Sequence, residues 1–279
     1  MRLRVLLMSV VCHILAFSAA AGSKAMAQVD TVSVPATCVV SPMRVTVVLP
    51  EQYFEKNDTA RYPVVYLLNG YGGDYSSWVT IRPDLDRLAS QYGMIFVCPD
   101  GRDSWYWDSP VDPEMQMESF IIKELVPYID SSYRTRAEAA GRAVTGLSMG
   151  GHGGLWLGMR HSDVFGSAGS TSGGVNIIPF PSKWKMAKRL GEYESNKERW
   201  EQHTVINLVP ALKPGQINII FDCGCDDFFA GKNEELHQAL LKHGIPHDYI
   251  SRPGNHTQKY WNNSILYQLM YFNERFSGR

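Results

Sequence analysis

The chain has 279 residues, of which 44% are hydrophobic and 20% charged, with a formal net charge of −1. A chain of this length and composition can bury a large core, and we expect one α/β domain rather than two. Nothing in the sequence suggests the clustered basic surface that binds nucleic acid, so no nucleic-acid partner is expected.

The first 27 residues have the pattern of a secretory signal peptide. Two arginines precede an apolar run over residues 5–17, and small residues then lead to an A-x-A cleavage site that ends at Ala27. The run is short for a membrane span, so an uncleaved anchor is the weaker interpretation. We therefore expect cleavage after Ala27, a periplasmic or secreted protein without a stable membrane span, and one domain over residues 28–279.

Four cysteines follow the predicted cleavage site: Cys38, Cys98, Cys223 and Cys225. A domain of this size does not need disulfides, and Cys223 and Cys225 are too close in sequence to pair easily. No Cys/His spacing matches a zinc site. We interpret these side chains as buried thiols, and we expect no metal and no cofactor.

Strand and helix patterns alternate along the rest of the chain. Apolar runs predict strands at residues 45–50, 62–68, 94–101, 142–145, 165–174, 217–222 and 247–251. Helical patterns follow at residues 84–92, 115–133 (with a kink at Pro127), 149–160, 233–243 and 260–276. The pattern predicts an α/β fold with a mainly parallel central sheet and helices on both faces. The less regular residues 175–214 are predicted to form a short lid-like insertion over the pocket.

The stretch from Thr145 to Gly151 reads as a strand end, a tight turn that carries Ser148, and a helix start. Such a G-x-S-x-G turn lifts the serine hydroxyl above the sheet, and the helix N-terminus offers free N–H groups to developing negative charge. The motif alone is moderately specific, because Gly and Ser also occupy ordinary turns. Its position between a strand and a helix favours a nucleophile.

A serine nucleophile needs a base and an orienting carboxylate, which in α/β-hydrolases follow in the order acid, then histidine. Asp226 and Asp227 follow the strand at residues 217–222, and His256 lies on a glycine-marked loop after the last strand. We predict Ser148, Asp227 and His256 as the catalytic residues, with Asp226 as the alternative acid.

The remaining histidines are interpreted as structural. His152 lies one helical turn after Ser148 and is expected to pack or to form the pocket floor. The others after the signal peptide are expected to be exposed: His161, His203, His237, His243 and His247.

An oxyanion hole needs one N–H after the nucleophile and one from an earlier loop. Met149 follows Ser148, and Tyr71 lies in the glycine-rich loop at residues 69–73, so we predict these two backbone N–H groups as donors. A phosphate-binding loop is the rival interpretation, but the spacing and the lysine of a nucleotide loop are missing.

With these motifs, the chain resembles the putative-esterase family of α/β-hydrolases, which includes esterase D (S-formylglutathione hydrolase), tributyrin esterases, feruloyl and acetyl-xylan esterases and mycolyltransferases. The resemblance covers residues 45–275 and is carried by YLLNG at 66–70, PDG at 99–101, SWY at 104–106, GLSMGG at 146–151, GCDDF at 224–228 and GNH at 254–256. It implies the α/β-hydrolase fold and the same site residues. One departure is Asn69, where many relatives carry histidine.

Aromatic residues gather near the predicted site, and four are expected to contact substrate: Trp78, Trp105, Tyr106 and Trp261. The resulting prediction is an exported serine carboxylesterase for short-acyl, acetyl or feruloyl-type esters, as small molecules or linked to a polysaccharide. An acyltransferase of the mycolyltransferase type and a non-catalytic carbohydrate-binding protein are the alternatives. The sequence leaves the oligomeric state open.

Overall fold

The computed structural model describes residues 27–40 and 42–278. The predicted signal peptide therefore lies outside the described residues, except for Ala27. The first strand begins at Gln28, directly after the predicted cleavage site. None of the helices between residues 27 and 278 is long and apolar enough to cross a membrane.

An eight-stranded sheet crosses the described part of the chain in the order β1-β2-β4-β3-β5-β6-β7-β8. Its strands are β1 (Gln28–Val34), β2 (Met43–Leu49), β3 (Val64–Leu68), β4 (Ile95–Pro99), β5 (Arg142–Gly146), β6 (Ser167–Thr171), β7 (Asn218–Gly224) and β8 (Asp248–Arg252). The pairs between β4 and β8 are parallel, whereas β2 is antiparallel to both of its neighbours. The prediction of a mainly parallel sheet is confirmed; β1 was not predicted.

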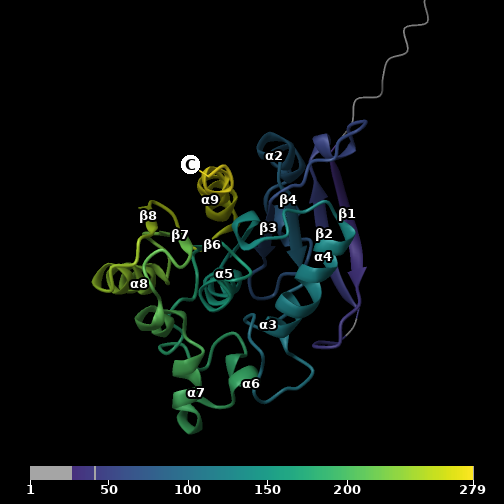
Figure 1. The fold of residues 1–279 in the computed structure, drawn as a ribbon. Helices are drawn as coiled ribbons and strands as arrows, with labels where there is room; N and C mark the ends of the chain where they lie inside the picture. The colour runs from purple at the N-terminus through teal and green to yellow at the C-terminus, as the bar shows by residue number, and fades with distance from the viewer. Residues whose placement is uncertain (1–26, 41, 279) are drawn as a thin grey trace, which may run out of the picture.

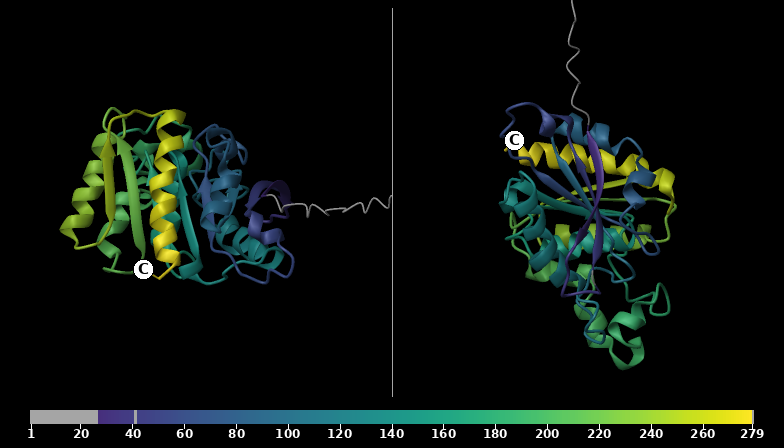
Figure 2. Two further views of the ribbon diagram at one scale, coloured as in Figure 1. Left: turned by 90° about the horizontal axis from the view of Figure 1, so that it is seen from above. Right: turned by 90° about the vertical axis from the view of Figure 1, so that its right-hand side faces the viewer.

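Helices cover both faces of this sheet. In the described residues they are α1 (Ser77–Ile81), α2 (Leu85–Tyr92), α3 (Met117–Ser119), α4 (Val126–Ser132), α5 (Met149–Arg160), α6 (Met186–Leu190), α7 (Lys197–Gln202), α8 (Ala230–Lys242) and α9 (Gln258–Phe276). Helices α2 and α9 pack on one face, and α4, α5 and α8 pack on the other (Figures 1 and 2). The strands between them are buried on both sides, which explains their continuous apolar runs.

The helix expected over residues 115–133 is divided. After α3 comes a π-helical segment, η2 (Phe120–Leu125), and α4 then begins with Pro127 in its first turn. Leu125 and Val126, at the junction, have right-handed helical backbone angles, so the chain stays helical from Met117 to Ser132. Proline has no N–H to continue the hydrogen-bond ladder, so an interruption of the regular α-helical pattern is expected beside it. The predicted irregularity at Pro127 is thus a π-helical segment that ends two residues before the proline.

The segment over residues 175–214 carries α6 and α7 and projects beyond α5 (Figures 1 and 2). It is fixed to the loop after β4 by Arg189, whose side chain is 2% exposed and forms ion pairs with Asp103 and Asp112. The Ser109 hydroxyl also donates to the Arg189 carbonyl oxygen at 2.8 Å. The expected insertion is thus a packed segment that is tied to the core.

Candidate active site

Ser148 stands at the tip of the turn between β5 and α5. Its backbone has φ 56° and ψ −115°, a conformation that persists only when the surrounding structure enforces it. A Cβ atom at Gly146 would lie 2.5 Å from the Gly150 carbonyl oxygen, and one at Gly150 would lie 2.3 Å from the Leu68 carbonyl oxygen. The two glycines of the motif therefore permit the close crossing of the turn over the end of β3.

The serine hydroxyl lies at the end of a chain of three hydrogen-bonded side chains. Ser148 Oγ is 2.9 Å from His256 Nε2, and Asp227 Oδ2 is 2.8 Å from His256 Nδ1. Because an ionised carboxylate only accepts, the imidazole donates from Nδ1, and Nε2 accepts the serine O–H. This is the geometry of a nucleophile, its base and the carboxylate that orients the base.

Of the two neighbouring aspartates, Asp227 faces the histidine. Its side chain is fully buried, and Oδ1 accepts the Phe229 N–H at 2.9 Å. Asp226 is exposed, and its backbone N–H donates to the Gly254 carbonyl oxygen at 2.9 Å. That backbone contact joins the loop after β7 to the loop after β8, so it helps to hold Asp227 and His256 together.

Near Ser148, the backbone N–H groups of Tyr71 and Met149 have no hydrogen-bond partner among the described residues. Met149 is the first residue of α5, where N–H groups have no intrahelical acceptor. Tyr71 follows Gly70, which passes so close to the nucleophile that a Cβ there would lie 3.4 Å from Ser148 Cβ. Both predicted oxyanion donors are thus unpaired beside the serine.

Asn69 braces the same loop. It is buried, and its Oδ1 accepts the Gly101 N–H at 2.8 Å and the Tyr106 hydroxyl at 3.0 Å. The amide thereby ties the loop after β3 to the loop after β4. This role is positional.

A cavity of about 450 Å³ opens over Ser148 and His256. Four aromatic side chains contribute to its walls: Tyr71, Trp184, Phe228 and Trp261. Trp184 comes from the 175–214 segment and stacks on Phe228 with ring centroids 5.9 Å apart. Phe228 and Trp261 also pack against the His256 ring, at 4.4 and 5.0 Å between centroids. The same aromatic residues therefore line the cavity and hold the imidazole in place.

Three of the four predicted substrate-contacting aromatics do not reach this cavity. Trp78, Trp105 and Tyr106 are at most 1% exposed. Trp78 Nε1 donates to the Leu68 carbonyl oxygen at 2.9 Å, and the Tyr106 hydroxyl binds Asn69. They pack beneath the site, so that prediction is corrected; Trp261 does line the cavity. Periodicity could not single out Trp184, and the only sequence signal for Phe228 was its position beside Asp227.

His152 is a buried packing residue, as expected. Its Nδ1 donates to the Gly174 carbonyl oxygen at 2.9 Å, and its Nε2 accepts the Trp107 indole N–H at 2.8 Å. Burial lowers the pKa of His152 to about 3, so the ring is neutral at ordinary pH.

For most of the other histidines the expected exposure is wrong. Only His243 is exposed in the described part of the chain, whereas His161, His203, His237 and His247 are half-buried and hydrogen-bonded. Their partners range from the distant Glu118 for His161 to the nearby carbonyl oxygens of Arg199 for His203 and of Ile245 for His247.

The cysteines between residues 27 and 278 are all free thiols. Cys98 and Cys223 are buried as expected, but Cys225 is exposed and Cys38 is half-buried, because both lie in loops. The described residues contain no cluster of His, Cys, Asp and Glu side chains that could hold a metal ion.

Comparisons with known proteins place the chain in an esterase family. The family profile described as "Putative esterase" matches residues 38–272. An esterase of Mycobacterium tuberculosis is 28% identical over 239 residues, a match that covers 76% of this chain and 52% of that protein. The chain thus spans about half the length of that relative.

Two further matches cover most of this chain and most of the matched protein. An acetyl esterase of Caldicellulosiruptor saccharolyticus is 27% identical over 229 residues, which covers 77% of this chain and 85% of the relative. A solved ferulic acid esterase superposes with a TM-score of 0.78 at 28% identity. The match covers 90% of this chain and 99% of the ferulic acid esterase chain. Together with the strand order, these matches confirm the predicted α/β-hydrolase fold.

Proposed function

Because the chain belongs to the putative-esterase family of α/β-hydrolases, we propose that it is a serine carboxylesterase that works through an acyl-enzyme. The observation that carries the proposal is the hydrogen-bonded chain from Ser148 through His256 to Asp227. The resemblance of the whole domain to proteins named as esterases supports the same reaction.

In this mechanism Ser148 Oγ attacks the ester carbonyl carbon while His256 Nε2 takes the hydroxyl proton. Asp227 stabilises the imidazolium and holds its orientation. The N–H groups of Tyr71 and Met149 receive the negative charge on the carbonyl oxygen. His256 then protonates the leaving alcohol, and a water molecule, deprotonated by the same histidine, releases the acid from the serine.

For the substrate, we propose short-acyl, acetyl or feruloyl-type esters, free or attached to a polysaccharide. Walls made of Tyr71, Trp184, Phe228 and Trp261 suit a planar aromatic acyl group, which can stack on or pack edge-to-face with such rings. Two similar proteins are named for esters with acyl groups of these kinds, one an acetyl esterase and the other a ferulic acid esterase.

Hydrolysis of an ester panel tests the proposal: p-nitrophenyl acetate and butyrate, methyl ferulate and acetylated xylan. We expect Ser148→Ala to abolish turnover of every ester that the native enzyme cleaves, whereas Ser195→Ala, at an exposed serine of the 175–214 segment, retains it. The preferred ester identifies the acyl class. A folded enzyme that cleaves no member, and whose Ser148 does not react with a fluorophosphonate, would overturn the proposal. Transfer of the acyl group to an added sugar in preference to water would instead identify an acyltransferase.

We also propose that the protein is exported and cleaved after Ala27. The sequence pattern supports this, and β1 begins at Gln28, so cleavage there leaves the sheet complete. N-terminal sequencing of protein from the periplasm or medium should give Gln28 as the first residue. An intact N-terminus on the cytoplasmic protein would contradict export.

A further inference from the structure

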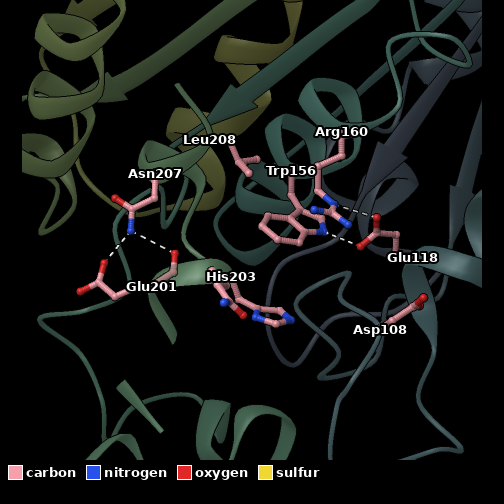
Figure 3. A pocket seen from close by; sticks show the side chains of 9 residues that line it. Asp108, Glu118, Trp156, Arg160, Glu201, His203, Asn207 and Leu208 are labelled. Carbon is pink, nitrogen blue, oxygen red and sulfur yellow. Dashed lines mark hydrogen bonds and ion pairs between the residues drawn. The ribbon is translucent and has the colours of Figure 1, made fainter. Parts of the chain in front are cut away.

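A second cavity, of about 530 Å³, lies near the C-terminal end of α5, whereas Ser148 precedes its N-terminal end. Figure 3 shows Trp156, Arg160 and Glu118 on one side, Glu201 and Asn207 on the other, and His203 between them. The volume is within the usual range of ligand pockets, about 300–1,000 Å³. This cavity shares no lining residue with the one over Ser148.

Hydrogen bonds hold the carboxylates of this cavity in place. Glu118 accepts from the Trp156 indole N–H at 2.8 Å, from Arg160 Nε at 2.8 Å and from His161 Nε2 at 2.7 Å. Burial alone would raise the pKa of Glu118, but the hydrogen bonds from His161, Arg160 and Trp156 outweigh it and keep the pKa below its ordinary value. Across the cavity, Glu201 accepts from the Asn207 amide at 2.6 Å.

Other polar atoms at the cavity remain unpaired. Within residues 27–278, the terminal nitrogens of Arg160 donate no hydrogen bond to protein, since only Nε is engaged. His203 Nδ1 donates to the Arg199 carbonyl oxygen at 2.7 Å, which leaves Nε2 as an acceptor without a partner in the described chain. Both groups lie against one aromatic ring: the guanidinium is 4.6 Å over the Trp156 ring, and the imidazole stacks on the same indole at 5.6 Å.

The charges limit what such a cavity can take. Three carboxylates, those of Asp108, Glu118 and Glu201, face one guanidinium, so an anionic ligand would be repelled. The carboxylates are already paired with protein donors, as Asp108 also accepts from the Ser119 N–H and hydroxyl, which leaves little to attract a free cation. A fixed planar donor and a fixed acceptor instead match hydroxyl groups, which both donate and accept.

We propose that this cavity binds a neutral sugar unit of an oligosaccharide or polysaccharide. The hydroxyls pair with Arg160 and His203, and the apolar ring face packs against Leu208. The ring contacts His203–Trp107, Trp107–Trp105 and Trp105–Trp184, at 5.7, 5.6 and 5.9 Å, connect this cavity to the wall of the ester cavity. A sugar bound here would leave the ester cavity free, since the two cavities share no lining residue.

Titration calorimetry with unesterified xylohexaose and cellohexaose tests the proposal on the full domain. We expect at least one to bind, and His203→Phe and Arg160→Met to weaken that binding tenfold or more. The phenylalanine keeps the stacking on Trp156 but removes the acceptor, and the methionine removes the terminal donors. Met270→Ala, at an exposed position on α9, is the matched control and should bind as the native protein does.

No ester takes part in this assay, so its result is independent of the proposed hydrolase activity. Thermal unfolding of each variant shows whether a loss of binding reflects a loss of structure. Absence of binding to both oligosaccharides would overturn the proposal. So would binding that persists in both folded cavity variants but disappears in Trp184→Ala, because the sugar would then occupy the ester cavity.

Discussion

The Asp227 carboxylate uses its two oxygens for different purposes. One accepts from the Phe229 backbone and fixes the loop after β7, and the other accepts from His256 and fixes the imidazole tautomer. Asp226 is adjacent in sequence but exposed, and the bond to His256 Nδ1 comes from Asp227. The two residues therefore make a matched pair for testing which carboxylate serves the base.

We predict that Asp227→Asn lowers kcat by about 10³- to 10⁴-fold, because an amide at that position favours the wrong imidazole tautomer. The neighbouring Asp226→Asn variant should retain activity within about threefold, since solvent already surrounds that side chain. Initial rates on p-nitrophenyl acetate measure the loss of activity in each variant. Equal losses in both variants, or the larger loss in Asp226→Asn, would reject the assignment of the acid.

Helix α5 is rich in glycine, although glycine destabilises an isolated helix. Five of its twelve residues are glycine, the weakest helix former after proline. At Gly154 an added Cβ would lie 2.4 Å from the Gly169 carbonyl oxygen, and at Gly158 it would lie 2.4 Å from Ala168 Cβ. The glycines let α5 pack directly on β6, which keeps the turn at Ser148 tight against the sheet.

Alanine substitutions at two helical glycines should therefore change the free energy of unfolding in opposite directions. Gly154→Ala is expected to lower the free energy of unfolding by about 1–3 kcal/mol, because neighbouring backbone must move. Gly231→Ala in α8, where nothing lies within 4 Å of the added Cβ, should raise it by about 0.5–1 kcal/mol. Urea unfolding of both variants measures this. A neutral result for Gly154→Ala would mean that α5 can withdraw from β6.

Across the whole molecule, the parallel sheet gathers the site from distant parts of the chain. Tyr71, Ser148, Asp227 and His256 follow β3, β5, β7 and β8, so all four lie at the carboxyl edge of the sheet. Register contributes as well: Leu68 pairs with Gly146, so the glycine-rich loop and the serine turn leave the sheet side by side.

Glu118 links α3 to α5 on the face opposite α9, and its ionisation should appear in the stability of the whole domain. Its pKa in the folded protein lies below its ordinary value, so its stabilising contribution is present above the unfolded pKa of about 4.3 and is lost as pH falls through the folded pKa. We expect Glu118→Gln to cost about 1–3 kcal/mol at pH 7, and less at pH 3.5.

Urea unfolding at the two pH values checks this prediction. Glu138→Gln, at an exposed carboxylate, serves as the control and should change stability by less than about 0.5 kcal/mol at either pH. If the deficit of Glu118→Gln were the same at both pH values, its stabilisation would not depend on the ionised carboxylate.

The sequence by itself determined the features that depend on local order. Apolar runs specified most strands and helices, because burial on both faces of a parallel sheet requires them. Ser148, Asp227 and His256 could be selected because each follows a recognisable strand and the order of the three is characteristic. The glycines around Ser148 could be read in the same way, since only a tight turn needs them at that spacing.

Tertiary structure alone decided which side chains face the cavities. Trp78 in α1 and Trp105 and Tyr106 in the loop after β4 turn into the core, whereas Trp184 reaches the cavity from a segment without periodicity. The groups that meet at the second cavity, such as Glu118 and His203, are 85 positions apart. These contacts depend on how α3, α5 and the 175–214 segment pack together, and that packing cannot be predicted from the spacing of residues along the chain.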